Sequence, residues 1–309
     1  MKKIIMYHYI RTYSNEFPFF NFLHINDFKK QINLFKKKNL LKISENFQNF
    51  ITSENKILLS FDDGIKDHYL IFKELLKHKI KGIFFISTYP IINKDFLDAH
   101  KIHLILGKFN LDQIIKAFDN FKIKINFKKI NSENKKYQLD STNNEDEKKK
   151  IKIKIFLNFN LKNDNNKIIK LLFDYFFSKK EQKELFKNFY LTKKQIKEMQ
   201  DKGMLIGGHS NTHKLLGNLT NKDQKLEIER NIQFLSKVIK EKINFFAYPY
   251  GGNLSFNKDT IKILNNNDVK FSFNTGNKYI RSKDINHNIP RINCNKFKFG
   301  QIYKNSSYD

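Results

Sequence analysis

Short apolar segments alternate with amphipathic segments over much of this chain, and this alternation constrains its fold more than any other feature. Residues 3–7 (KIIMY), 56–61 (KILLSF) and 81–87 (KGIFFIS) have the apolar character of buried strands. Between them, 25–39 and 69–80 place apolar residues at near-helical spacing. Strands that alternate with helices predict an α/β fold, either with an open sheet or closed into a barrel.

The same rhythm returns after residue 190, and the region before that residue has a different character. We interpret 93–190 as an insertion, a lid or a substrate-specifying subdomain, within a single domain that spans 1–309. Inside it, 131–154 is almost entirely polar and charged, which predicts a mobile loop. The segments on either side of the insertion are therefore expected to build the α/β part together.

The charge of the chain suggests an anionic partner without identifying one. The 309 residues carry 58 basic and 31 acidic side chains, a formal net charge of +27, which fits nucleic acid, an anionic membrane surface or an acidic glycan. The alternative is a general enrichment in Lys, Asn, Ile and Phe, as in a chain from an AT-rich genome, because the lysines are scattered and arginine is scarce. No nucleic-acid recognition motif is visible, so a nucleic-acid partner is not expected.

The N-terminus and the single cysteine give information about the cellular compartment of the protein. The apolar run in MKKIIMYHYIR is short and is interrupted by His8 and Arg11, unlike the apolar core of a signal peptide. No segment reaches the roughly 18 apolar residues of a membrane span. Cys294 has no second cysteine for an intramolecular disulfide or a cysteine-rich zinc module. We expect a cytoplasmic protein, with peripheral contact to the inner membrane or unusual export as alternatives.

Two polar motifs follow predicted strands and together suggest a metal site. In LLSFDDG, Asp62 and Asp63 are adjacent at the end of a buried strand, where two carboxylates repel unless something compensates. In HSNTH, His209 and His213 are four residues apart, which places two imidazoles on one side of a helical turn. Each motif alone is weak, since DDG is also a turn sequence. Together they supply two imidazoles and one carboxylate, a known catalytic zinc arrangement, and leave one carboxylate as a general base.

Three motifs in chain order, LLSFDDG, HSNTH and FAYPYGG, resemble those of the polysaccharide deacetylases, also called carbohydrate esterase family 4 or NodB-homology proteins. The resemblance covers 1–92 and 195–300. It implies a distorted (β/α) barrel with fewer than eight strands, here with a large insertion. It also implies metal-dependent N-deacetylation of N-acetylated sugars, usually N-acetylglucosamine units.

The resemblance implies a role for each matching residue. Asp62 resembles the general base, and the Tyr250 backbone N–H resembles the donor that stabilises the oxyanion. Pro249, Tyr250 and Gly251 resemble the wall of the substrate groove. The implied ligands of one divalent metal, usually zinc and sometimes cobalt or nickel, are Asp63, His209 and His213.

The chain departs from the usual family pattern at two catalytic positions. The third motif usually begins with an Arg that orients the base, and here that position is Ala247. Arg291, in NIPRINC, can supply the guanidinium from another strand, as in the poly-N-acetylglucosamine deacetylase-like branch, the alternative being a surface Arg. In that branch the general acid lies in an N-terminal Tyr-His pair, which here is IMYHYI and gives His8. His287 in a later loop, or no histidine acid, are the alternatives. The remaining histidines receive no role: His24, His68, His78, His100 and His103.

The sequence thus predicts a metal-dependent hydrolase that removes acetyl from an N-acetylated amino sugar of a surface glycan or its precursor. A lipid-linked or nucleotide-linked precursor would suit the basic surface through its phosphates, and an anionic membrane surface would suit it through its headgroups. Two alternatives remain open. One is a hydrolase of the same fold that acts on a small non-sugar amide or ester. The other is a non-catalytic protein that binds an anionic glycan or nucleic acid.

Overall fold

The chain divides into two units, and the second interrupts the first in sequence. The computed structural model describes residues 2–36, 39–128, 130, 144–160, 165–252, 254–281 and 286–304. The first unit contains Met1–Thr12, Phe22–Asp95 and Asn188–Ile302, and the second contains Tyr13–Asn21, Phe96–Lys187 and Tyr303–Asp309. The second unit thus includes most of the region 93–190, whose interpretation as a lid or substrate-specifying part remains a prediction.

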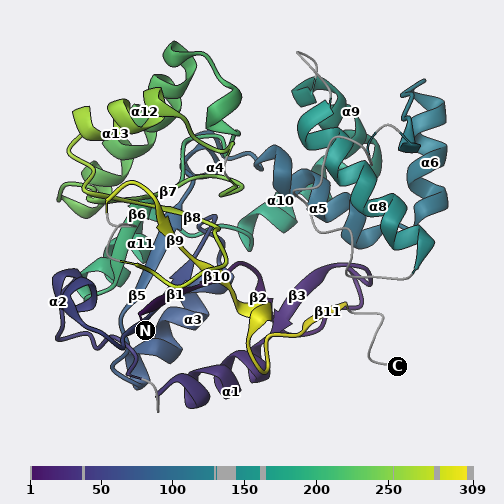
Figure 1. The fold of residues 1–309 in the computed structure, drawn as a ribbon. Coiled ribbons are helices and arrows are strands. Elements are labelled where there is room, and N and C mark those ends of the chain that lie inside the picture. The colour runs from purple at the N-terminus through teal and green to yellow at the C-terminus, as the bar shows by residue number, and fades with distance from the viewer. Residues whose placement is uncertain are drawn as a thin grey trace. The chain divides into compact units, whose positions relative to one another are not determined.

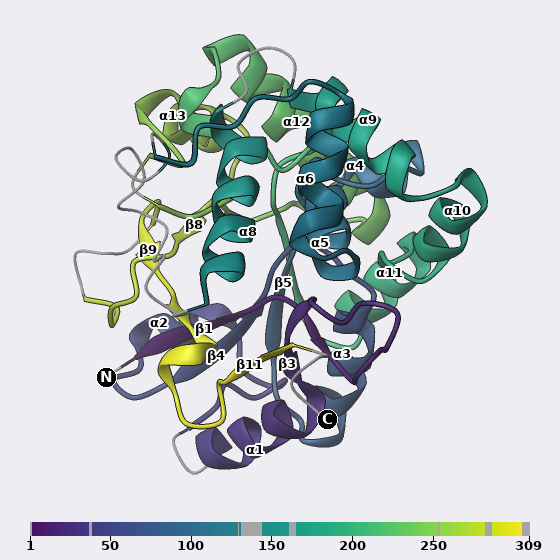
Figure 2. The ribbon, with the colours of Figure 1, turned by 90° about the vertical axis from the view of Figure 1, so that its right-hand side faces the viewer.

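A parallel sheet forms the centre of the first unit (Figure 1), with the strand order β10-β1-β4-β5-β6-β7-β8-β9. All of its strand pairings are parallel. Figure 2 shows β1, β4 and β5 as neighbouring strands from a second side. The strands are β1 (Lys3–Tyr7), β4 (Ile57–Phe61), β5 (Gly82–Ile86), β6 (Leu205–Gly208), β7 (Phe245–Ala247), β8 (Phe271–Asn274), β9 (Ile289–Pro290) and β10 (Ile292–Asn293).

The sheet closes into a barrel through one interrupted segment. β9 and β10 are separated only by Arg291, and β9 pairs with β8 while β10 pairs with β1. Counting this segment once turns the eight strands of the sheet into seven positions around the barrel. The predicted α/β class and the distorted barrel with fewer than eight strands are therefore confirmed.

Side chains along the barrel strands alternate between the interior and the layer under the helices, as the two-residue period of a strand requires. Because both faces of this sheet are covered, its strands are apolar throughout, and all five residues of β4 are buried. The outer face packs on the helices through residues such as Ile5, Leu59 and Phe84. The interior cluster includes Ile4, Leu58, Ile83, Phe85, Phe245, Ala247, Phe273 and Ile289.

Seven helices of the first unit accompany the barrel in the described part of the chain. Helix α2 lies at the amino ends of the strands, because Phe47 stacks its ring 4.9 Å from that of Phe245 and 4.8 Å from that of Phe271, the first residues of β7 and β8. The helices are α1 (Ile25–Lys36), α2 (Phe47–Thr52), α3 (Asp67–Lys77), α4 (Tyr89–Asn93), α11 (Lys193–Asp201), α12 (Asn221–Ile239) and α13 (Lys258–Asn266).

The structure also contains a smaller sheet and two short 3₁₀ helices. The sheet has the order β11-β3-β2, formed by β2 (Ile10–Arg11), β3 (Asn21–His24) and β11 (Ile302–Lys304). The 3₁₀ helices are η2 (Leu216–Asn218) and η4 (Cys294–Lys296). Among the described helices, none has the length and apolar character needed to cross a membrane.

The second unit is helical and has its own aromatic core. Phe96 makes edge contacts with the rings of Phe173 at 5.4 Å and Phe186 at 5.3 Å, and the ring of Phe109 is tilted against that of Phe176 at 4.4 Å. Its elements are α5 (Asp98–Lys108), α6 (Leu111–Asn120), α8 (Glu145–Ile155), the π-helix η1 (Phe156–Asn160), α9 (Asn165–Phe176) and α10 (Lys179–Lys187).

The prediction of a mobile loop over 131–154 is wrong for its C-terminal part, because 145–155 forms helix α8. Asn144 caps this helix by accepting hydrogen bonds from the backbone N–H groups of Asp146 and Glu147. Ile153 and Ile155 are buried, so the helix is stabilised by packing that its polar composition conceals. Residues 131–143 lie outside the described part of the chain.

The single cysteine is predicted to be chemically inert in the folded protein. Cys294 is buried in the core of the first unit, and burial raises the pKa of its thiol to about 12. Since the thiolate is the reactive species, we expect no labelling by a disulfide reagent at pH 8 and complete labelling once denaturant is added. Rapid labelling of the native protein, followed by absorbance, would contradict the buried position of η4.

Candidate metal centre

Polar residues lie at the carboxyl ends of neighbouring barrel strands. Asp62 and Asp63 follow β4, His209 follows β6, and Tyr250 comes shortly after β7. Parallel strands end at the same edge of a barrel, so these loops meet there. The structure brings Asp63, His209 and His213 together as one group of potential metal ligands.

The separations of Asp63 from the two histidines suit a tetrahedral ion. Asp63 Oδ1 lies 3.4 Å from His209 Nε2 and 3.3 Å from His213 Nε2, and the ligating atoms all lie within 4.8 Å of one another. Zinc bonds of about 2.0–2.2 Å at tetrahedral angles place neighbouring ligand atoms about 3.4 Å apart. Asp63 therefore stands at the distance from each histidine that a shared zinc-sized ion would require.

The hydrogen bonding of His209 also indicates a cation at this position. Its Nδ1 lies 2.8 Å from the carbonyl oxygen of Ala247 and must carry a proton to donate to it. In the neutral ring, Nε2 then has only a lone pair, and this lone pair faces a carboxylate oxygen of Asp63. Two electron-rich atoms at 3.4 Å repel unless a proton or a metal ion lies with them. The residues therefore fit a divalent metal.

The pKa values of the two histidines agree with this arrangement. Burial lowers the pKa of His209, but the carboxylates of Asp63 and Asp62 outweigh it and raise the pKa above its usual value. For His213 burial is the larger effect and lowers the pKa, which the Asp63 carboxylate only partly opposes. A neutral imidazole is the form that binds a metal. Of the two histidines, only His209 has a pKa raised by neighbouring carboxylates, so without a metal only His209 tends to bind a proton.

The backbone at the site is strained at four non-glycine residues. Positive φ angles occur at Asp63 (81°), Ser210 (57°), His213 (59°) and Tyr250 (64°). Such conformations cost on the order of 1–3 kcal/mol each and persist where the surroundings impose them, commonly at functional sites. The turn after β4 thus redirects Asp63, which in a continuing strand would face the helices, toward the two histidines.

Asp62 is held by a buried arginine from the segment that closes the barrel. Arg291 Nη1 donates to Asp62 Oδ1 at 2.6 Å, and Nη2 donates to Oδ2 at 2.8 Å. Both side chains are almost completely buried, and they continue the inward alternation of β4 and β9. Burial alone would raise the pKa of Asp62, but Arg291 and His209 outweigh it and lower the pKa. Asp62 is therefore an ionised carboxylate in a fixed orientation.

Arg291 occupies the interior beside Asp62, whereas Ala247 contributes only backbone to the site. The guanidinium lies 5.1 Å from the ring centre of Phe85, and its Nε donates to the carbonyl oxygen of Asn274 at 3.2 Å. Ala247 accepts the hydrogen bond from His209 through its carbonyl. This geometry agrees with the expectation that Arg291 supplies the guanidinium that position 247 lacks. It does not agree with the alternative that Arg291 is a surface residue, because its side chain is fully buried.

His8 also approaches Asp62 and is accessible to solvent. Its Nε2 is 4.0 Å from Asp62 Oδ2, and its side chain is 41% exposed. The backbone places it there, because β1 ends at Tyr7 and the Tyr7 carbonyl accepts a hydrogen bond from the Asp62 N–H at 3.1 Å. The structure therefore brings His8 to the site at the strand end where the Tyr-His pair predicted it.

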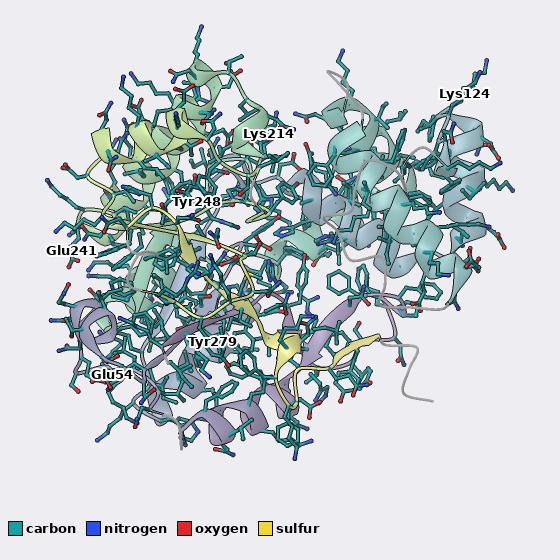
Figure 3. The ribbon with its side chains drawn as sticks, in the orientation of Figure 1. Glu54, Lys124, Lys214, Glu241, Tyr248 and Tyr279 are labelled. Carbon is teal, nitrogen blue, oxygen red and sulfur yellow. The ribbon has the colours of Figure 1, made fainter. Side chains whose placement is uncertain are left out.

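His287, the alternative acid, lies outside the barrel. Its Nδ1 is 3.0 Å from Ser272 Oγ and its Nε2 is 2.6 Å from Asn265 Oδ1 on α13. Ser272 also contacts the hydroxyl of Tyr248, which is labelled in Figure 3 and belongs to the cluster between the barrel and the helices. His287 thus lies on the helix side of β8, and the structure does not join it to Asp62.

The turn after β7 places Tyr250 beside the ligands. Its ring centre is 4.8 Å from that of His213, and Pro249 before it is buried. Gly251 has a φ of 61°, and a Cβ there would lie 2.2 Å from Cγ2 of Thr275, so no other residue fits without movement. The Thr275 N–H also donates to the Gly251 carbonyl at 2.8 Å. This turn is therefore held rigidly beside the candidate ligands.

A buried amide from α12 fixes the loop that carries the two histidines. Asn231 Nδ2 donates to the carbonyl oxygens of Ile86 at 2.8 Å and Ser210 at 2.7 Å. From the same helix, Glu227 accepts hydrogen bonds from both the N–H and the hydroxyl of Thr212. The His213 N–H donates to Ser210 Oγ at 2.9 Å. Hydrogen bonds therefore link α12, through Ser210, to the candidate ligand His213.

Replacing Asn231 with leucine is expected to weaken metal binding by about 10- to 100-fold, as loss of a buried partner behind metal ligands commonly does. The measurement is a competition titration with a chromogenic chelator. Gln224→Leu is the matched control, since Gln224 is an equally buried amide on α12 that bonds to Leu219 and Thr260 instead. Equal effects of the two variants would show that Asn231 contributes stability alone.

Asn231 was not among the residues predicted from the sequence. The sequence contained one signal, a polar residue between Ile228 and Ile232 on the apolar stripe of a long amphipathic helix. A polar residue in such a stripe is buried with the stripe and needs a partner. Which partner it has depends on the packing of α12 against β6, so the signal could not assign a role.

Comparison with known proteins found one family model that matches part of the chain. The polysaccharide deacetylase family model matches residues 146–272. This span contains HSNTH and FAYPYGG, while Asp62 and Asp63 lie before it. A search of curated proteins found no match.

Three solved structures share the fold over most of the chain. Deacetylase PplD of Streptococcus pyogenes, solved in complex with acetate, is 16% identical with a TM-score of 0.56, over 94% of this chain and 91% of that chain. A de-N-acetylase from Aggregatibacter actinomycetemcomitans is 14% identical with a TM-score of 0.51, over 94% of each chain. The polysaccharide deacetylase BC0361 from Bacillus cereus is 14% identical with a TM-score of 0.51, over 94% of this chain and 64% of that chain.

Proposed function

We propose that this chain, whose residues 146–272 match the polysaccharide deacetylase family model, is a metal-dependent hydrolase that removes acetyl from an N-acetylated amino sugar. The observation that carries the proposal is the arrangement of two adjacent carboxylates. Asp63 lies with His209 and His213 as a metal-ligand group, and Asp62 is held apart from that group by Arg291. Acetate, the ligand named for the similar S. pyogenes deacetylase, is the product that such a reaction releases.

Asp63, His209 and His213 would hold one divalent metal, with zinc as the first choice because of the nitrogen-rich ligand set and the tetrahedral separations. Cobalt and nickel are the alternatives that imidazole also accepts. When bound, such a metal supplies Lewis acidity, which polarises the acetyl carbonyl and lowers the pKa of water to about 7. Three protein ligands leave further positions for water and substrate.

Asp62 would act as the general base. It is ionised because Arg291 neutralises its charge, and two hydrogen bonds to the guanidinium hold its plane in one orientation. It would accept a proton from the attacking water as the water oxygen bonds to the acetyl carbon. Arg291 is a positioning residue in this scheme, since it contacts the base and not the substrate.

His8 and Tyr250 would complete the reaction. The Tyr250 backbone N–H would donate to the carbonyl oxygen as negative charge develops on it. His8, 4.0 Å from Asp62 on its exposed side, would donate a proton to the sugar nitrogen as the carbon–nitrogen bond breaks. One water and one acetamido group thus give acetate and a free amine, and the two protons are accounted for by Asp62 and His8.

The test is release of acetate from N-acetylglucosamine oligomers by metal-loaded protein, with detection of the new amine. A lipid-linked or nucleotide-linked N-acetylated sugar, an O-acetylated sugar and a simple acetamide are assayed beside them, which separates the substrate classes. Asp62→Asn should lower the rate by about 10²- to 10⁴-fold while retaining the metal. No acetate from any amide, by protein that holds its metal, would overturn the proposal and favour a binding role.

A further inference from the structure

The first turn of α3 contacts the segment that carries His8. His68, the second residue of the helix, is fully buried, and its Nε2 lies 3.0 Å from the carbonyl oxygen of His8. Asp67, the first residue, accepts two hydrogen bonds from the guanidinium of Arg11, at 2.8 and 3.0 Å. Two neighbouring side chains of one helix thus hold both ends of residues 8–11.

The His8 carbonyl lies outside the hydrogen bonding of both sheets, and the side chain of His68 provides its hydrogen bond instead. β1 ends at Tyr7 and β2 begins at Ile10, so His8 lies between the two sheets. The carbonyls on either side accept backbone hydrogen bonds, Tyr7 from Asp62 and Tyr9 from Leu23. The carbonyl of His8 is held by a side chain instead, at the residue whose imidazole reaches toward Asp62.

The chemistry of the acceptor determines the protonation of His68. A carbonyl oxygen only accepts, so Nε2 of His68 must carry the proton. Its Nδ1 is buried and has no hydrogen-bond partner within the described residues, and the ring packs against Phe61 at 5.6 Å and Phe84 at 6.0 Å. Burial in this apolar pocket is the largest influence on the pKa of His68 and lowers it, against weaker opposing effects of the hydrogen bond to the His8 carbonyl and of Asp67 and Asp63. His68 is thus a neutral donor in a fixed orientation.

We propose that His68 is a positioning residue that, through its hydrogen bond to the His8 carbonyl, holds the His8 imidazole in place to protonate the leaving amine. This inference rests on the proposed function of His8 as general acid. The His8 side chain is 41% exposed and is not enclosed by packing, so its position depends on its backbone. Because α3 follows the turn that carries Asp62 and Asp63, the same helix would couple the acid to the base and to the metal ligand.

The test compares two substrates that differ in their need for an acid. An N-acetylglucosamine oligomer loses a strongly basic amine, which must be protonated, whereas p-nitrophenyl acetate loses a phenolate that needs no proton. For His68→Leu we expect kcat on the amide to fall about 10²-fold, the scale of a misplaced catalytic group, with metal content and ester hydrolysis close to those of the wild type. His68→Gln, whose side-chain N–H can reach the same carbonyl, should recover most of the amide activity.

The control is His78→Leu, which removes a hydrogen-bonded histidine just after the other end of α3. It should leave both substrates unaffected. Equal losses of amide and ester hydrolysis in His68→Leu would overturn the proposal in favour of a purely structural role. An unchanged amide rate in a folded variant would overturn it as well.

A second measurement does not depend on activity. Backbone hydrogen exchange over residues 8–11 should accelerate in His68→Leu and not in His78→Leu, because only the former releases the His8 carbonyl. If the wild type hydrolysed neither substrate, the proposed function would fail while this measurement still tested the positioning. Unchanged exchange in His68→Leu would refute the positioning whether or not the enzyme is active.

Discussion

Replacing Asp63 or His213 with alanine is expected to reduce the bound metal from about one ion per chain to almost none, because each removal leaves only two protein ligands. Amide hydrolysis should then fall by at least about 10²-fold, since Lewis-acid stabilisation is worth several kcal/mol. Metal content is measured by mass spectrometry on protein loaded with zinc and freed of excess ion. This result would establish the site on which every step of the proposed mechanism depends.

The matched control for this experiment is Lys214→Ala. Lys214 directly follows His213, is exposed and is labelled in Figure 3. Its replacement changes the same loop without touching the ligand group, so the metal content should stay at the wild-type value. A wild type that binds no metal after loading, or alanine variants that both keep it, would contradict the assignment of Asp63 and His213 as ligands.

Replacing Arg291 with methionine is expected to destabilise the protein by about 3–5 kcal/mol, because it leaves the Asp62 carboxylate buried without its partner. The free energy of unfolding is measured by urea denaturation. The deacetylase rate should fall in the same variant, since Asp62 loses both its fixed orientation and the charge that lowers its pKa. Arg230→Met on the exposed face of α12 is the control and should change stability by less than about 0.5 kcal/mol.

A double variant separates the two effects of Arg291. Asp62→Leu/Arg291→Met removes both charges, and replacing a buried ion pair with apolar residues is often neutral for stability. We expect it to recover most of the stability lost in Arg291→Met and none of the activity. If activity returned together with stability, Asp62 would not be the base, and the pair would be structural only.

The barrel strands were predictable because they are buried on both faces. Parallel strands under helices appear as apolar runs in the sequence, and KIIMY, ILLSF and GIFFI are such runs. The approach of Asp63, His209 and His213 to one another was predictable for a related reason. Parallel strands end at one edge of the barrel, so motifs that directly follow them in the sequence must meet in space.

Helix α8 could not be identified in the same way. Its sequence, EDEKKKIKIKI, is dominated by charge, and its isoleucines alternate with lysines in a pattern that is not helical. The Asn144 cap is local to the helix, but the burial of Ile153 and Ile155 depends on packing within the second unit. Composition alone therefore described this segment incorrectly from residue 145 onward.

The sequence by itself determined the α/β class, the carboxyl edge where the polar motifs lie, and the residue types of the candidate metal site, because these follow from periodicity and from adjacency to strand ends. Only the tertiary structure decided which of two histidines approaches Asp62, that Arg291 reaches it from 229 positions away, and that Asn231 and His68 hold the loops of the site. Each of these contacts joins polar groups of residues that are far apart in the chain. Such contacts have no period in the sequence, and only packing of one element on another selects the partner.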